Sequence, residues 1–342
     1  MRNSLMRLIA LCLSIGVTAT CLAAPKDKTT IKEKATDSPR ITDFPPGVFT
    51  DGGSYRYDDF KGKILVLFLY EQDCPSCRGQ IPERNAMMAR FRDKPVKFIA
   101  VAAGDSLADA KMYAKTTGLM MPTFADPFSL MEKDRRYTPQ PISLMNIYQM
   151  PAIMPDGSVR SAGLKGERLD DLVDKAKWKY KDGGYNPKLA GAIELLEWNQ
   201  YEAGMKLLRA MRKDSNKDVA ASAEKLYEAV KTEAADWKSE ADAAVAEQPA
   251  VAFDLFTRLK NCFPDEEATF GADAALKMLK TNKNVLDEQA ARKQFVKMSQ
   301  AMANAKYSQK GEVQSFCESI AKQYPDTPTG KRAKSVAELM GK

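Results

Sequence analysis

Seven consecutive apolar residues, Ile64 to Tyr70, are followed after three polar residues by Cys74-Pro75-Ser76-Cys77. A continuous apolar run of this length predicts a buried central strand that is covered on both faces. Proline is favoured in the first turn of a helix, and a helical pattern follows from about residue 78 to 91. We therefore predict a strand that leads directly into a helix, with two cysteines, three positions apart, at the junction.

The rest of the first half alternates between strand and helix patterns. Strands are predicted at 96–101 and 121–125, with a helix at 106–117 between them, which is typical of βαβ units. The turn Pro155-Asp156-Gly157 lies between two short strand patterns and predicts a hairpin. A closing amphipathic helix is expected at 169–176. The fold class predicted for residues 44–180 is an α/β domain with a central mixed sheet flanked by helices.

The second half is predicted to be entirely helical. Residues 181–187 are glycine-rich and polar and are predicted to be a linker, and 188–342 shows hardly any strand pattern. A weak internal repeat is visible: Phe263-Pro264-Asp265 and Tyr324-Pro325-Asp326 each lie between amphipathic helices. An alanine stands eight residues after each proline, at Ala272 and Ala333, and a fainter copy near Lys213-Asp214 has Ala221 at the same offset. These observations favour an irregular tetratricopeptide-like array, and the alternative is a helical bundle without a true repeat.

The N-terminus predicts export. Residues 1–24 carry two arginines, then an apolar stretch that ends in small residues, which is typical of a secretory signal peptide. Residues 25–43 are polar and are predicted to be a flexible leader. The expected location is the periplasm or another extracytoplasmic compartment, where disulfides persist. Two alternatives keep the protein attached to the membrane, through an uncleaved anchor or through a lipid on Cys21.

Composition excludes several classes of function. The chain of 342 residues has no histidine, which excludes His-dependent hydrolases, His-ligated zinc sites and histidine proton shuttles. It has 52 Lys and Arg against 45 Asp and Glu, and removal of Arg2 and Arg7 with the signal leaves 50 against 45. An excess of five positive charges does not indicate nucleic-acid binding. No cofactor, metal or membrane contact beyond targeting is predicted.

The pair Cys74 and Cys77 has three common uses: a redox dithiol, half of a zinc site, or a structural disulfide. A zinc site needs two more ligands, and Cys262 and Cys317 lie 55 residues apart in another region. At the start of a helix, the Cys74 sulfur is favoured as a thiolate and therefore as a nucleophile. Cys77, one turn later, would attack a mixed disulfide formed at Cys74. The redox dithiol is the preferred hypothesis, and a structural disulfide is the alternative.

This order of elements resembles the thioredoxin superfamily, and within it the TlpA/redoxin (AhpC/TSA-like) branch, over about residues 44–180. The resemblance is carried by Asp59-Phe60-Lys61-Gly62-Lys63, by Cys74-Pro75-Ser76-Cys77-Arg78, by Pro122-Thr123-Phe124-Ala125-Asp126-Pro127, and by Met150-Pro151 with Asp156-Gly157. It implies that Cys74 is the attacking thiol and Cys77 the resolving thiol. It also implies substrate contacts at Pro75, Ser76, Met150 and Pro151, with Pro151 in the cis form. The implied partners are a protein thiol or disulfide substrate and an upstream redox partner.

The sequence departs from the family's pattern around the cysteines. Asp73 replaces the aromatic residue that commonly precedes the first cysteine, and Phe68 stands where thioredoxins proper keep a buried aspartate. Residues 137–148 are longer than the usual path to the proline strand and predict an extra loop. A peroxiredoxin relative would have Thr or Ser three residues before the reactive cysteine, and Glu71 stands there, so peroxidase activity is disfavoured.

Two hypotheses of function follow. The first is an exported thiol–disulfide oxidoreductase, with an accessible Cys74, a buried Cys77 and a helical domain that binds a protein partner. The second is a non-catalytic periplasmic adaptor whose helical repeats carry the function while the CPSC disulfide is inert. Cys262 and Cys317 are expected either to bridge two helical hairpins or to remain as buried free thiols.

Overall fold

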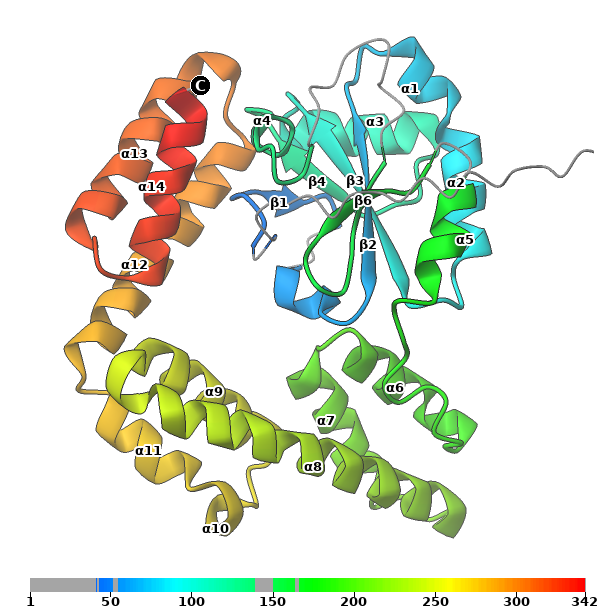
Figure 1. Ribbon diagram of the computed structural model, residues 1–342, viewed down its shortest axis with the longest axis vertical. Helices are drawn as coiled ribbons and strands as arrows, with labels where there is room; N and C mark the ends of the chain where they lie inside the picture. The colour runs from blue at the N-terminus through cyan, green and yellow to red at the C-terminus, as the bar shows by residue number, and fades with distance from the viewer. Residues whose placement is uncertain (1–40, 42, 52–54, 139–149, 164–165, 342) are drawn as a thin grey trace, which may run out of the picture. The chain divides into compact units, whose positions relative to one another are not determined.

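A computed structural model of the chain describes residues 41, 43–51, 55–138, 150–163 and 166–341, all within one compact unit. Its first half contains one mixed six-stranded sheet in the order β1-β4-β3-β2-β5-β6 (Figure 1). Neighbours β2, β3 and β4 run parallel, whereas β1 and β5 run antiparallel to their inner neighbours. The strands are β1 Val48–Phe49, β2 Ile64–Tyr70, β3 Val96–Ala103, β4 Thr123–Asp126, β5 Pro151–Ile153 and β6 Val159–Ser161.

Strand β2 is interior and buried on both faces, as its apolar run predicts. Ile64, Val66, Phe68 and Tyr70 belong to one hydrophobic core, and Leu65, Leu67 and Leu69 belong to another on the opposite face. The alternation follows from the two-residue period of a strand. The first core also contains both cysteines of the CPSC motif, so the sheet and the dithiol share one packed interior.

The helices around the sheet follow the predicted α/β plan, although the closing helix lies at Glu167–Val173 and not at 169–176, and α4 was not predicted. The predicted helix at 78–91 begins earlier, at Pro75, and is interrupted at Gln80. The cause is Pro82, which has no N–H to donate to the Arg78 carbonyl and whose ring would clash with it. The helical elements here are η1 Tyr57–Phe60, α1 Pro75–Gly79, α2 Ile81–Arg90, α3 Leu107–Thr117, α4 Leu130–Lys133 and α5 Glu167–Val173.

The second half is helical, and its described residues contain no strand between 187 and 341. None of the helices in the described part of the chain has the length and apolar character needed to cross a membrane. The elements are η2 Pro187–Leu189, α6 Ala190–Glu197, α7 Tyr201–Met211, α8 Lys217–Glu247, α9 Pro249–Cys262, α10 Glu267–Phe270, α11 Ala272–Leu279, α12 Lys283–Ala303, η3 Tyr307–Gln309, α13 Lys310–Gln323 and α14 Pro328–Gly341.

Two copies of the predicted repeat have the same local backbone. Phe263 (φ −130°, ψ 61°) and Tyr324 (φ −130°, ψ 55°) each end a helix of 14 residues. The N–H of each donates to the carbonyl four residues earlier, and Ala272 and Ala333 are both buried. The fainter copy differs, because Ala221 is exposed. Helix α8 starts after its cap at Asn216, and this start turns the neighbouring Ala223 inward instead.

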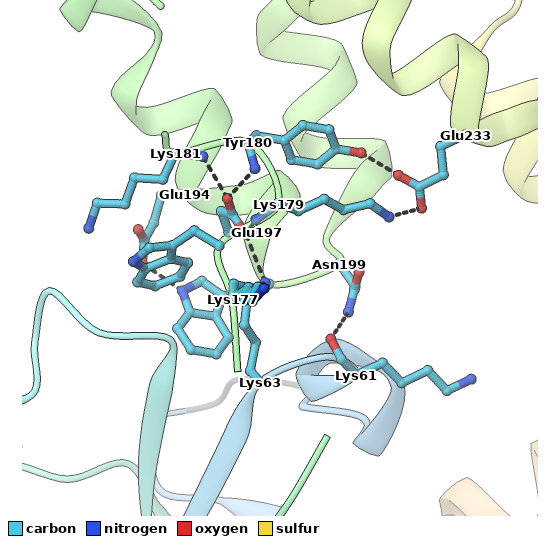
Figure 2. A network of polar contacts seen from close by, with 12 residues as sticks. Lys61, Lys63, Lys177, Lys179, Tyr180, Lys181, Glu194, Glu197, Asn199 and Glu233 are labelled. Carbon is cyan, nitrogen blue, oxygen red and sulfur yellow. Dashed lines mark hydrogen bonds and ion pairs between the residues drawn. The ribbon is translucent and has the colours of Figure 1, made fainter. Parts of the chain in front are cut away.

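A buried carboxylate joins the sheet region to the helices (Figure 2). Glu197 of α6 forms an ion pair of 2.8 Å with Lys63, which immediately precedes β2, and both side chains are less than 5 % exposed. The Glu197 carboxylate also accepts the backbone N–H groups of Lys179, Tyr180 and Lys181 at 2.9, 2.5 and 2.8 Å. Burial raises the pKa of Glu197, but these donors and Lys63 outweigh it and hold the pKa below its ordinary value.

The last three α-helices return to the sheet region. Phe128 and Leu130, at and just before α4, share a hydrophobic core with residues of α12, α13 and α14. The Arg332 side chain of α14 forms an ion pair of 2.9 Å with Asp43 and donates to the Phe44 carbonyl. The helical region is therefore attached to the sheet region at its beginning and at its end.

Most of the predicted leader lies outside the described residues, but its end is part of the fold. Ile41 is only 2 % exposed, and its N–H donates to the Gly157 carbonyl at 3.1 Å. The Tyr137 hydroxyl donates to the Asp43 carbonyl. The described structure thus begins before residue 44, because Ile41 supplies an apolar side chain to the core beside Phe44.

Candidate active site: the Cys74–Cys77 dithiol

The end of β2 and the start of α1 place the two cysteines. After Tyr70 the chain turns, with the Cys74 N–H donating to the Glu71 carbonyl at 3.2 Å. Cys74 then caps α1 in an extended conformation, and Pro75 occupies the first helical turn, where its missing N–H has no consequence. The Cys77 N–H donates to the Cys74 sulfur at 3.1 Å. The sulfur of Cys74 therefore takes the position of an N-cap acceptor, which the sequence pattern predicts.

The two thiols differ in exposure. Cys74 is 9 % exposed and Cys77 only 1 %, so Cys74 is less accessible than expected, although it is the more accessible of the two. Burial raises the pKa of the Cys77 thiol to about 12, and its hydrogen bond to Cys74 adds to the increase. Both are free thiols in this structure. Of the two cysteines, Cys74 is therefore the one that keeps some contact with solvent.

The predicted substrate contacts lie in two places. Pro75 and Ser76 are exposed beside Cys74. Met150 is buried in the hydrophobic core that holds both cysteines, and Pro151 follows it as the first residue of β5. The predicted extra loop at 137–148 lies outside the described residues from position 139 onward.

Three further polar groups stand next to the dithiol, and the sequence analysis did not identify them. The rings of Tyr70 and Tyr113 stack with centroids 4.4 Å apart. Burial raises the pKa of Tyr113 to about 12, and the sulfurs of Cys77 and Cys74 and the Asp105 carboxylate contribute to the increase. Among the described residues, the hydroxyls of Tyr70 and Tyr113 and the Oδ2 atom of Asp105 have no hydrogen-bond partner.

Asp105 belongs to this cluster because of the sheet topology. It follows β3, and β3 runs parallel to β2 with Ala102 opposite Tyr70, so both strands end at the same edge. Burial raises the pKa of Asp105 to about 6, with further increases from Asp109, Asp73 and Glu71. The rule that carboxyl ends of parallel strands meet at one edge would have predicted this position.

The second pair of cysteines forms no disulfide. Cys262 and Cys317 are free and fully buried, and they belong to two different hydrophobic cores. Burial raises the pKa of each thiol to about 12. Of the two outcomes expected from the sequence, the structure has the buried free thiols. No group of residues suited to a metal ion occurs in the described parts of the chain.

Comparisons with known proteins find similar chains over the sheet region. Residues 42–145 match the AhpC/TSA family model. The chain is 27% identical over 133 residues to thiol-disulfide oxidoreductase ResA from Bacillus thuringiensis, and equally to ResA from Bacillus cereus. Each match covers 38% of this chain and 72% of the relative.

Two solved structures are also similar. A thioredoxin family thiol:disulfide interchange protein from Chlorobium tepidum has 23% identity and a TM-score of 0.32, with 41% of this chain and 96% of that chain covered. The thioredoxin domain of a thiol-disulfide oxidoreductase from Bacteroides vulgatus has 19% identity and a TM-score of 0.32, with 40% and 96% covered. Both TM-scores are low, so the strand order carries the argument for the fold. Over residues 42–145 the sheet region resembles the AhpC/TSA family, and a helical region follows it.

Proposed function

We propose that this protein is an exported thiol–disulfide oxidoreductase that reacts through Cys74 and resolves through Cys77. The observation that supports it best is the asymmetry of the dithiol: Cys74 caps α1 and is 9 % exposed, whereas Cys77 is 1 % exposed. The related ResA proteins are named as thiol-disulfide oxidoreductases. The proposed domains are a signal peptide at 1–24, a leader at 25–43, a thioredoxin-like domain at 44–180, a linker at 181–187 and a tetratricopeptide-like domain at 188–342.

The exchange proceeds in two steps in the reducing direction. The Cys74 thiolate attacks one sulfur of a client disulfide, the client's S–S bond breaks, and its second sulfur leaves as a thiolate that takes a proton from water. Cys77 then loses its proton and attacks the Cys74 sulfur. The Cys74–Cys77 disulfide forms, the client's first sulfur leaves, and the client has gained two electrons. An upstream redox partner returns the pair to the dithiol.

The environment of Cys77 favours this order of events. Burial raises the pKa of Cys77, and so do its hydrogen bond to Cys74 and the charge repulsion between the two sulfurs. In the mixed disulfide Cys74 carries no charge, so the repulsion from Cys74 disappears when Cys77 must ionise. Pro75, Ser76, Met150 and Pro151 are the proposed contacts for the client's backbone.

A partner-binding role is proposed for the helical region. A cavity of about 1000 Å³ is lined by residues of both regions, most of them charged or polar, together with the aromatic residues Trp178, Tyr201 and Trp237. Leu207, Met278 and Leu286 are large apolar side chains exposed on helices α7, α11 and α12. Aromatic and apolar side chains of this kind suit a polypeptide partner.

The test is the reduction potential of the Cys74–Cys77 pair, measured by thiol trapping in glutathione and dithiothreitol buffers. The Cys262→Ala/Cys317→Ala variant isolates the signal, because alanine leaves no buried hydroxyl. We expect a reversible two-electron transition that Cys74→Ala abolishes. A pair that stays oxidised in strong reductant, or that never closes, would refute the enzyme and favour the adaptor hypothesis. Hydrogen peroxide with dithiothreitol checks the absence of peroxidase turnover, which we expect from Glu71.

A further inference from the structure

The surroundings of Cys74 are acidic in a chain that is basic overall. The chain has a formal net charge of +7. Five carboxylates nevertheless surround the edge of the sheet where the dithiol lies, and we name them the acidic rim: Glu71, Asp73, Asp105, Asp109 and Glu132. They come from three segments: the loop before α1, the start of α3 with the residues before it, and α4.

The rim carboxylates are close enough to affect one another. Asp109, Asp73 and Glu71 each raise the pKa of Asp105, in addition to its burial. Burial also raises the pKa of Glu132, and Glu71 raises it further. The rim is therefore one electrostatic feature although its members are far apart in the sequence.

The described residues only partly compensate the charge of this rim. Within the described residues, none of the five carboxylates forms an ion pair, and Asp105 Oδ2 is a buried oxygen without a hydrogen-bond partner. Beneath the rim, Tyr70 and Tyr113 are 2 % and 1 % exposed, and their hydroxyls are also without partners. Three cations stand nearby. The Arg78 guanidinium lies 5.9 Å from the centroid of the Tyr113 ring, and Lys133 and Arg135 act on Glu132.

We propose that the acidic rim selects client polypeptides whose reacting cysteine is flanked by lysine or arginine. This inference rests on the proposed function, since it concerns the reactant that meets Cys74. Glu71 lies three residues before Cys74 and Asp73 one residue before it, and both are exposed. A client whose cysteine reaches the Cys74 sulfur therefore brings the side chains beside that cysteine close to these two carboxylates. Opposite charges accelerate such an encounter, and like charges retard it.

The probes are three synthetic peptide disulfides of the form Gly-X-Cys-X-Gly, with Lys, Gln or Glu at X. The reduced protein is mixed with each peptide at pH 7.5, and the rate of Cys74–Cys77 oxidation is followed by thiol trapping. The variant Glu71→Gln/Asp73→Asn/Glu132→Gln neutralises three exposed or half-exposed rim charges. The matched control, Glu228→Gln/Asp236→Asn/Glu240→Gln, removes three charges from exposed positions on α8.

We expect the wild type and the α8 control to oxidise at least about tenfold faster with the lysine peptide than with the glutamate peptide at low salt. The ratio should fall in 0.5 M NaCl, where screening acts over a few ångströms. The rim variant should show a smaller ratio at low salt. Comparison between proteins removes the effect of charge on the intrinsic reactivity of the peptides.

Two failures are distinguishable. If the rim variant keeps the wild-type ratio of rates, or if the wild-type ratio is unchanged by salt, the rim does not select clients and the inference is wrong while the enzyme stands. If no peptide, including the glutamine peptide, oxidises the dithiol, the proposed function itself is wrong.

Discussion

Asp105 is a half-buried carboxyl group beside the dithiol, and its contribution to the stability of the fold depends on pH. Its folded-state pKa of about 6 is above the ordinary value of 3.8. The folded protein therefore binds more protons than the unfolded chain between these two values. By linkage, this group lowers the stability of the fold progressively as the pH rises from about 4 to 6.

We predict that Asp105→Asn stabilises the protein at pH 7.5 more than at pH 4.5. Asparagine keeps the shape of the side chain and carries no charge whose hydration is lost. The measurement is urea unfolding of the variant and the wild type at both pH values. Asp182→Asn, at an exposed position, is the control and should show no difference between them. An equal effect of Asp105→Asn at both pH values would mean that folding does not raise the pKa of Asp105.

Cys77→Ala should accumulate a mixed disulfide at Cys74, whereas Cys74→Ala should form none. The reason is the difference in exposure, because Cys74 keeps some contact with solvent and Cys77 keeps almost none. The measurement is non-reducing electrophoresis after incubation with the glutamine peptide, or with extracts from which clients are identified by mass spectrometry. Trapping through Cys77 in the Cys74→Ala variant would reverse the proposed roles.

At the scale of elements, Gly330 tests the turn that ends the second repeat copy. A Cβ atom at Gly330 would lie 1.8 Å from the Tyr324 carbonyl oxygen, so the backbone must move to accept it. We predict that Gly330→Ala lowers the free energy of unfolding by about 1–3 kcal/mol, the usual cost of overpacking. Gly311→Ala is the matched control, because nothing lies within 4 Å of its Cβ. It should be neutral or stabilising by up to about 1 kcal/mol, since alanine favours helix. Chemical denaturation measures both.

The elements that the sequence predicted best are those fixed by local pattern. The seven apolar residues of β2 predict an interior strand because only a strand with two covered faces buries them all. The two dipeptides Phe263-Pro264 and Tyr324-Pro325 predict two helix ends with one conformation, because proline does not continue the helix. The position of Cys74 at the start of a helix was predicted in the same way, from the apolar strand before it and Pro75 after it.

What the sequence did not predict depends on contacts between distant segments. Asp105 joins the dithiol only through the parallel pairing of β2 and β3, and Tyr113 only through the packing of α3 on that pair. The exposure of Ala221 depends on the start of α8 after its cap at Asn216. The eight-residue offset used to align the repeats gives no information about where that helix starts. Ile41 looks like part of a polar leader until its packing beside Phe44 is known.

At the scale of the whole molecule, Glu197 holds the helical region to the sheet. We predict that Glu197→Gln costs about 3–5 kcal/mol of stability at pH 7, because it leaves Lys63 charged and buried without a counter-ion. The folded-state pKa of Glu197 is lowered, so its contribution is complete above 4.5 and is lost as the pH falls through the folded-state value. The cost of the substitution should therefore shrink in acid.

The measurement is urea unfolding followed by far-ultraviolet circular dichroism and by tryptophan fluorescence, since Trp178 and Trp198 lie at this junction. Lys63→Met/Glu197→Gln, which removes both charges and keeps an oxygen acceptor for the backbone N–H groups at 179–181, should recover part of the lost stability. A Glu197→Gln variant as stable as the wild type would show that the ion pair does not hold the two regions together.

The burial of the two thiols of the helical region limits which cysteines can react with oxidants. Cys262 and Cys317 are each sealed in a separate core, and their high pKa values keep them as unreactive thiols. In the native fold a bulky maleimide should therefore label Cys74 alone among the four cysteines that the structure describes, and all four after denaturation. Among the described cysteines, oxidation and disulfide scrambling are thus confined to the sulfur that Cys77 can rescue. A thiol lost at Cys74 can be recovered by its neighbour, and the helical cores keep their own thiols out of that exchange.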